Sequence, residues 1–239
     1  MRRRFFVEQF TDSRAVIEGE AAHHLGRVLR AQEGQLYELS DGKRVWLGRV
    51  ERATRDRIEF ALIEEIAVVQ PSVEVTLLLS IVKFDAFEWA IEKATELGVG
   101  TIVPVAAGRS EKALISAAAK RAERWKKILL EASQQSRRVR VPVLEEMARA
   151  TDAFGSSNGS TKIMLSERRE APLLPQILSA PTSSKAVTLA IGPEGGWTDS
   201  EFDVARRVGF LEASLGKLIL RTETAVVAAL ASLNYALEQ

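Results

Sequence analysis

The sequence contains no cysteine and only two histidines, His23 and His24. The lack of cysteine excludes disulfide bonds and any cysteine-ligated metal. The two histidines are adjacent and have no acidic or histidine partner at ligand spacing, so we expect no metal site. No apolar run approaches the roughly 20 residues that a membrane-spanning helix needs, and the apolar part of the first residues is too short for a signal peptide. These absences predict a cytoplasmic protein without metal and without a membrane segment.

A large net charge is also lacking, because 33 Lys and Arg balance 32 Asp and Glu to a formal charge of +1. Whole-chain electrostatics therefore give no argument for nucleic acid. The local distribution does, because ten basic residues stand against three Glu between Arg109 and Arg140, an excess of seven. Phosphate binding depends on such a local patch rather than on the total charge.

Residues 1–70 carry twelve basic side chains, of which eleven are arginine, and twelve acidic ones. Short β-branched and aromatic runs predict strands within 5–10, 15–17, 36–39, 45–50 and 58–63. Asp41-Gly42 predicts a hairpin turn, and residues 20–31 place apolar side chains on one face of a helix. Several short strands with one helix indicate a small β-barrel over residues 1–70. Its arginines either only keep the exposed strand faces hydrated or bind the phosphates and bases of RNA.

Gln70-Pro71-Ser72 predicts a domain boundary. Beyond it, strands alternate with helices, which indicates an α/β domain over 71–239 with a parallel sheet covered on both faces. The predicted elements are strands at 75–82, 101–105 and 162–166 and helices at 84–98, 111–134 and 172–178. Residues 153–160 are polar and aperiodic and predict a loop. On the helix at 111–134, Lys120, Arg124 and Lys127 form a stripe that is either a solvated face or an RNA contact.

The stretch 187–198, Val-Thr-Leu-Ala-Ile-Gly-Pro-Glu-Gly-Gly-Trp-Thr, is the most informative one. Its apolar start predicts a buried strand, which Gly192 and Pro193 end. Thr198 and Glu201 form a capping box and predict the start of a helix. Strand, glycine turn and helix start together expose backbone N–H groups to a ligand. Gly195 and Gly196 also let a flat ligand approach the main chain.

A second stretch, 215–225, reads Leu-Gly-Lys-Leu-Ile-Leu-Arg-Thr-Glu-Thr-Ala and leads into a helix at 224–237. The two stretches together resemble the SPOUT class of RNA methyltransferases, and more narrowly the RsmE family, which methylates N3 of a uridine in 16S ribosomal RNA of the small subunit. Three further segments are similar to that family, at 24–30, 93–99 and 131–142. Arg137 departs from the family pattern, which has glycine there, so the backbone turn is in doubt.

The resemblance implies a PUA-like barrel followed by a SPOUT domain with a C-terminal trefoil knot, although topology rules disfavour knots. It also implies S-adenosyl-L-methionine as the cofactor, bound in a cleft made by three turns. No Gly-x-Gly-x-x-Gly follows a strand, which disfavours a Rossmann-type methyltransferase. The implied cofactor-binding residues are Leu165, Ile191, Gly192, Pro193, Gly195, Gly196, Leu215, Gly216, Leu218, Ile219, Leu220, Thr224 and Ala225.

Uracil N3 becomes a good nucleophile only after it loses its proton. Arg221 is expected to stabilise the resulting anion, with a structural ion pair as the alternative. Glu194 or Glu223 is expected to accept the proton, or instead to fix Arg221 through a bidentate pair. Thr222 and Glu223 also suit plain capping of the following helix.

The cations that we expect to contact RNA are Arg2, Arg3, Arg4, Arg27, Arg30, Lys83, Arg109, Arg124, Arg138 and Arg140. The family further implies a homodimer through the C-terminal domain, with 16S ribosomal RNA or the small subunit as partner. Two rival functions remain, a non-catalytic RNA-binding assembly factor and a SPOUT methyltransferase for another RNA position.

Overall fold

A computed structural model of the chain describes residues 3–27, 31–69, 71–159, 161–179 and 186–237. The chain forms two compact units, and each is described by itself. Unit 1 comprises Met1–Gln70 and Ser133–Val141, and unit 2 comprises Pro71–Ala132 and Pro142–Gln239. The segment 133–141 therefore belongs to unit 1 although unit 2 precedes and follows it in the sequence. Within the described ranges, no helix is both long and apolar enough to cross a membrane.

Unit 1 is a barrel-like sheet of five strands in the order β1-β3-β4-β5-β2. β1 runs parallel to β3 and the other pairs are antiparallel. Its elements are β1 (Arg4–Phe6), β2 (Arg14–Glu18), α1 (Gly19–Arg27), β3 (Leu36–Ser40), β4 (Val45–Ala53) and β5 (Arg57–Ile66). Alternating side chains point inward, and Phe5, Leu39, Ile58 and Phe60 form the core with Leu25 of α1. This agrees with the small barrel predicted from the sequence.

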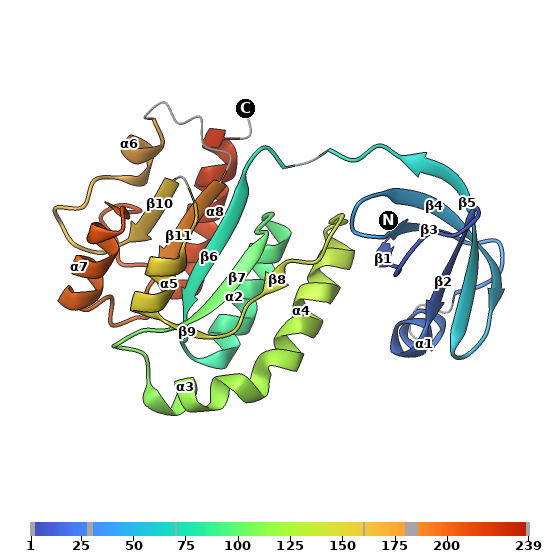
Figure 1. Cartoon of the computed structure of the whole chain (residues 1–239), viewed down its shortest axis with the longest axis horizontal. Helices are drawn as coiled ribbons and strands as arrows, with labels where there is room; N and C mark the ends of the chain where they lie inside the picture. Colours follow the sequence, from blue (N-terminus) through green and yellow to red (C-terminus); the bar gives the residue numbers. More distant parts are fainter. Residues whose placement is uncertain (1–2, 28–30, 70, 160, 180–185, 238–239) are drawn as a thin grey trace. The chain divides into compact units, whose positions relative to one another are not determined.

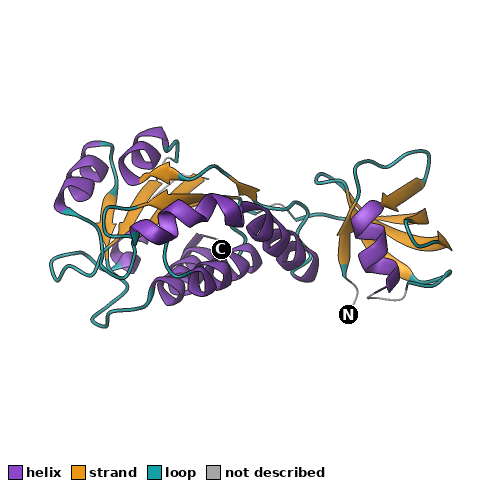
Figure 2. Ribbon diagram, turned by 90° about the horizontal axis from the view of Figure 1, so that it is seen from below, coloured by secondary structure: helices purple, strands orange, loops and turns teal. Residues whose placement is uncertain are grey.

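Unit 2 contains a sheet of parallel strands in the order β12-β10-β11-β6-β7-β8, with β9 also paired to β7. Helices lie on both faces of this sheet (Figures 1 and 2). The strands are β6 (Glu74–Ser80), β7 (Thr101–Ala106), β8 (Val143–Leu144), β9 (Ala148–Arg149), β10 (Thr161–Leu165), β11 (Ala186–Ile191) and β12 (Leu211–Ala213). β6 and β11 lie in the middle and read as almost continuous apolar runs because both of their faces are covered.

The helices of unit 2 form two layers. On one face, α2 packs against α8, and on the other, α5 packs against α7 over Leu78, Met164 and Ala190 (Figure 1). The helices are α2 (Phe84–Glu96), α3 (Lys112–Ala118), α4 (Ala122–Gln135), α5 (Ala150–Ser156), α6 (Leu174–Leu178), α7 (Asp199–Arg207) and α8 (Thr222–Leu237). A single 3₁₀ turn, Ala119–Arg121, separates α3 from α4 where one helix was predicted. The α/β class with a parallel sheet is confirmed.

The loop predicted at 153–160 is wrong over its first half, because α5 continues to Ser156. Ala150, Ala153 and Phe154 are buried at helical spacing. The Phe154 ring packs against Trp197 at a centroid distance of 5.3 Å and against Phe210 at 5.2 Å. This tertiary packing outweighs the low helix propensity of the glycine and serine residues that follow.

Candidate active site

Three turns meet at the carboxyl edge of the parallel sheet. β10, β11 and β12 are neighbours, with Leu165 in register with Ala213 and Met164 in register with Ala190. Because parallel strands end at the same edge, the turns that begin at Ser166, Gly192 and Ser214 come together although they are far apart in sequence. The carboxyl edge of an α/β sheet is where such folds bind ligands.

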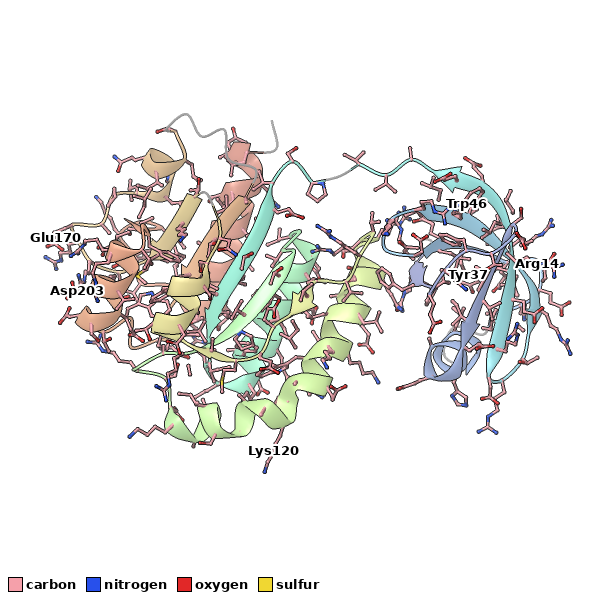
Figure 3. The ribbon with its side chains drawn as sticks, viewed as in Figure 1. Arg14, Tyr37, Trp46, Lys120, Glu170 and Asp203 are labelled. Atoms are coloured by element: carbon pink, nitrogen blue, oxygen red, sulfur yellow. The ribbon has the colours of Figure 1, made fainter. Side chains whose placement is uncertain are left out.

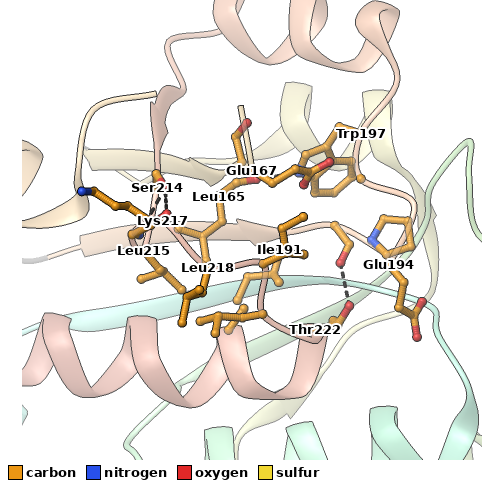
Figure 4. A pocket seen from close by; sticks show the side chains of 18 residues that line it. Leu165, Glu167, Ile191, Glu194, Trp197, Ser214, Leu215, Lys217, Leu218 and Thr222 are labelled. Carbon is orange, nitrogen blue, oxygen red and sulfur yellow. Dashed lines mark hydrogen bonds between the residues drawn. The ribbon is translucent and has the colours of Figure 1, made fainter. Parts of the chain in front are cut away.

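Hydrogen bonds join the three turns to one another. The buried indole Nε1 of Trp197 donates to the carbonyl of Leu165 over 3.1 Å. The Thr222 hydroxyl donates to the carbonyl of Gly192 over 3.1 Å (Figure 4). The backbone N–H of Ser166 donates to the carbonyl of Ala213 over 2.9 Å. The turns are therefore held in fixed positions by main-chain and buried side-chain contacts.

Two glycines in the turns are required by the backbone. Gly196 has φ +69°, and a Cβ there would collide with the carboxylate of Glu167. Gly216 has φ +134°, a region that only glycine adopts without strain. At Gly192, a Cβ would lie 3.2 Å from the Trp197 ring. The absence of side chains at these points keeps the space between the turns open.

The turns enclose a cleft that opens to solvent, with about 680 Å³ of empty space when the open mouth is included. Most of the expected cofactor-binding residues line it, namely Leu165, Ile191, Gly192, Pro193, Gly196, Leu215, Gly216, Leu218, Ile219, Leu220 and Ala225. Gly195 and Thr224 do not line it. The cleft is also lined by residues that the sequence did not assign to cofactor binding, namely Ser166, Glu167, Trp197, Ser214, Lys217 and Thr222.

Two further contacts hold the glycine turn from the side of β7. Arg109, in the loop after β7, donates from Nη1 to the carbonyl of Gly195 over 2.8 Å. The buried carboxylate of Glu201 accepts from the backbone N–H of Gly108 over 2.8 Å and from that of Thr198 over 2.7 Å. Thr198 is the N-cap of α7 and completes the predicted capping box. The turn is thus supported at both of its ends.

The three expected catalytic residues differ in their positions. Glu194 lines the cleft, whereas Arg221 and Glu223 lie just outside the lining. Arg221 is exposed and Glu223 half-buried, at the start of α8. Among the described residues, no ion pair joins Arg221 to Glu194 or Glu223. In the described part of the chain, the Arg221 guanidinium forms no ion pair.

Several of the cations expected to bind RNA have protein partners. Arg4 pairs with Glu38 over 2.9 Å, with only 11% of its side chain exposed. Arg124 donates to the buried Glu88 over 2.7 Å. Burial, followed by the positive charge of Arg140, lowers the pKa of Arg138 to about 10. Arg3, Lys83, Arg109, Arg124 and Arg140 are exposed. Arg2 and Arg30 lie outside the described residues, and only the backbone of Arg27, in α1, is described.

The lining of the cleft is suited to a flat, largely apolar ligand ring. Its walls combine apolar side chains, such as Leu165, Ile191 and Leu220, with backbone groups of the glycine turns. Within the described ranges, no group of three His, Asp or Glu residues is placed to hold a metal ion. An apolar slot with a few fixed polar groups is the usual design of a site for a flat cofactor ring.

Comparisons with known proteins agree with this geometry. A family model for an RNA methyltransferase domain matches residues 69–234, and a model for the PUA domain of RNA methyltransferases matches residues 17–63. The chain therefore belongs to the RNA methyltransferases that carry a PUA domain.

Within this class, the chain is a member of the ribosomal RNA small subunit methyltransferase E family. It is 32% identical to that enzyme from Synechocystis sp. over 97% of its own length and 76% of the relative's. It is 31% identical to the Aquifex aeolicus enzyme, with 88% and 89% coverage. The crystal structure of the Neisseria gonorrhoeae enzyme bound to S-adenosyl methionine superposes with a TM-score of 0.88, at 32% identity and 98% coverage of both chains. The resemblance seen in the sequence is confirmed, and the trefoil knot stays a prediction.

Proposed function

We propose that this protein transfers a methyl group from S-adenosyl-L-methionine to N3 of a specific uridine in 16S ribosomal RNA of the small ribosomal subunit. The observation that carries the proposal is the cleft built by the turns after β10, β11 and β12. Its backbone-lined, apolar character matches an adenosine cofactor. Membership of the family and the cofactor-bound Neisseria structure support the same conclusion.

The chain's own task in this reaction is to position the reactants. When bound, S-adenosyl-L-methionine supplies a methyl group that its sulfonium has already activated. The protein must hold the donor and acceptor in line and make the acceptor nucleophilic. The expected cofactor-binding residues at 165, 191–196, 215–220 and 224–225 hold the donor in this proposal. Thr222 and Trp197 keep the turns in place.

Arg221 and Glu194 carry the proposed chemistry at the acceptor. Arg221 is exposed beside the cleft, so its charge is available to the uracil oxygens that become negative when N3 loses its proton. Glu194 lines the cleft and is exposed, which favours it over Glu223 as the proton acceptor. Glu223 then supports the N-terminus of α8, where a negative charge is favourable.

We further propose that the exposed cations of residues 1–70 and 109–140 bind the RNA and that the protein is a cytoplasmic homodimer. The dimer is proposed to form through the C-terminal unit. Leu218 and Ile219 leave 81% and 82% of their surfaces exposed, which is unusual for adjacent large apolar side chains and suits a covered surface. Sedimentation at micromolar concentration should give twice the chain mass, and a monomer mass would contradict the dimer.

The central test combines cofactor binding with product analysis. Calorimetry should show one S-adenosyl-L-methionine bound per chain. Mass spectrometry of 16S RNA, offered both as naked RNA and within small subunits, should then show one methyl group at uridine N3. Cofactor binding without methylation would favour an assembly factor. A methyl group on another base or on ribose would favour a different SPOUT activity. Arg221→Ala should abolish turnover while cofactor affinity stays near normal, and equal loss of both would defeat its catalytic role.

A further inference from the structure

Glu167 is an acidic residue of the cleft that has no role in the proposed methyl transfer. It lies two residues beyond the end of β10 and lines the cleft (Figure 4). Ser166 and Gly196 line the same cleft. Its carboxylate packs directly on Gly196, where a Cβ would come within 3.2 Å of Glu167 Cδ and Oε2 and closer still to Oε1. The carboxylate therefore lies against the glycine turn, although Glu167 as a whole is exposed.

The neighbours of Glu167 hold its backbone in place. The Arg168 guanidinium pairs with Asp199 over 2.5 Å and stacks over the Phe202 ring at 3.7 Å from its centroid. The backbone N–H of Arg168 also donates to the Ser166 hydroxyl over 3.0 Å. Arg168 thus attaches this turn to the start of α7. A rigidly supported carboxylate in a cleft is pre-organised for a ligand.

The carboxylate of Glu167 has acceptor capacity to spare. Within the described part of the chain, no hydrogen bond or ion pair of its side chain is found. The other charged side chains that line the cleft are Glu194 and Lys217. A carboxylate oxygen accepts hydrogen bonds and donates none. A ligand group that binds here must therefore present hydrogen-bond donors.

We infer that Glu167 recognises the ribose of the cofactor by accepting hydrogen bonds from its hydroxyl groups. This inference rests on the proposed function. The apolar walls, including Leu165, fit the adenine ring, and Glu167 is only two residues from Leu165. In the cofactor, the ribose is bonded directly to adenine, whereas the ammonium of the methionine part lies several bonds farther away. A carboxylate beyond the end of a parallel strand is a known means of binding ribose hydroxyls.

The test compares the affinities of the wild type, Glu167→Gln and Glu170→Gln for three ligands. Glu167→Gln removes the charge at constant size. Glu170→Gln is the matched control, because Glu170 is exposed on the same loop, projects outward (Figure 3) and does not line the cleft. The probes are S-adenosyl-L-methionine, S-adenosylhomocysteine and 5′-methylthioadenosine. The last probe has the adenine and ribose but neither the sulfonium nor the ammonium. Affinities are measured by calorimetry, with thermal unfolding as the folding control.

The inference predicts that Glu167→Gln weakens all three probes by about tenfold, the usual effect of losing a charged acceptor, and that Glu170→Gln changes none. The 2′-deoxy or 3′-deoxy form of 5′-methylthioadenosine should bind the wild type more weakly than the parent. In Glu167→Gln, this penalty should shrink, because the neutral amide oxygen accepts a weaker hydrogen bond than the carboxylate does. Such loss of discrimination is not expected if the substitution merely loosens the turn, because the penalty would then persist.

Each contrary outcome overturns the inference in a recognisable way. Loss of affinity for the two probes that carry an ammonium, but not for 5′-methylthioadenosine, would assign Glu167 to the ammonium. Loss for S-adenosyl-L-methionine alone would assign it to the sulfonium charge. Unchanged affinities would show that Glu167 does not contact the cofactor. If the wild type itself bound none of the three probes, the proposed function would fail instead.

Discussion

The hydroxyl of Thr222 donates a hydrogen bond to the carbonyl of Gly192 over 3.1 Å, across 30 residues of sequence. Thr222 is only 4% exposed and begins α8, whereas Gly192 follows β11. This bond joins the second and third turns of the cleft. Plain helix capping, which the sequence also allowed for Thr222, does not describe what its hydroxyl does.

We predict that Thr222→Val weakens both stability and cofactor binding. The substitution keeps the shape of the side chain but leaves the Gly192 carbonyl without this donor, which costs about 1–3 kcal/mol when the group is buried. Urea unfolding and calorimetry with S-adenosyl-L-methionine measure the two effects. Thr222→Ser retains the hydroxyl and should lose much less. Thr151→Val, at an exposed threonine of α5, serves as the control. Equal behaviour of the valine and serine variants would contradict the role of the hydroxyl.

Glu201→Gln should destabilise unit 2 by about 1.5–3 kcal/mol, the range for hydrogen bonds to a charged group. The carboxylate accepts from Gly108, from the Thr198 backbone and, over 2.8 Å, from the Thr198 hydroxyl. An amide would turn an NH₂ group toward one of these donors and leave it unpaired. The control is Asp203→Asn, on the exposed side of α7 (Figure 3), which should shift the urea midpoint little. An unchanged urea midpoint for Glu201→Gln would contradict the stabilising role of the Glu201 carboxylate.

Arg109→Ala should weaken cofactor binding about threefold to tenfold, because the turn at Gly195 loses a hydrogen bond of 2.8 Å. Arg109→Lys should recover part of the affinity, since lysine keeps a donor but not the planar fork. Lys112→Ala, at the exposed start of α3, is the control for cofactor affinity. Calorimetry gives the cofactor affinity, and a filter-binding assay gives the RNA affinity. If only RNA binding fell, Arg109 would act as an RNA contact and not as a support of the turn.

Arg137 adopts φ +55°, so the chain keeps a left-handed turn where the family pattern has glycine. Its side chain also lies 3.6 Å from Glu38, at 40% exposure, a contact of small expected value. We predict that Arg137→Gly is more stable than Arg137→Ala by about 1 kcal/mol, because both lose the side chain but only glycine adopts this φ without cost. The same pair of substitutions at Arg140, where φ is not positive, should show no advantage for glycine. Thermal unfolding measures the stability of each variant. An Arg137→Ala protein as stable as Arg137→Gly would contradict the prediction.

The sequence predicted the strands of the sheet best where they are long and apolar. β6 and β11 are continuous apolar runs, and the capping box at Thr198 and Glu201 marked the start of α7. β12 was missed because it has only three residues, of which Leu211 is 49% exposed. Its strand character comes from parallel pairing with β10, a tertiary interaction that no local pattern reveals.

The sequence predicted the parts of the site in which glycines form the turns. It did not predict most of the single polar side chains that line the cleft or hold the turns together. Gly192 and Gly196 marked a ligand turn because they lie between an apolar strand and the capping box of a helix. Nothing in the pattern around Glu167 distinguishes it from Glu170, because only the fold brings one of them against Gly196. The partners of Arg4 and Arg124, Glu38 and Glu88, are likewise more than 30 residues away. The sequence therefore overestimated how many arginines are available to bind RNA, because some of them pair with glutamates that are distant in the sequence.

The third wall of the cleft comes from β12 and the turn after it, near the end of the chain. The first two turns begin at Ser166 and Gly192, and the cleft between them is completed only when Leu211–Ala213 pairs with β10. A nascent or truncated chain that stops short of this strand has no complete slot for a nucleotide. Cofactor binding therefore depends on the pairing of β12 with β10, which positions the third side of the cleft.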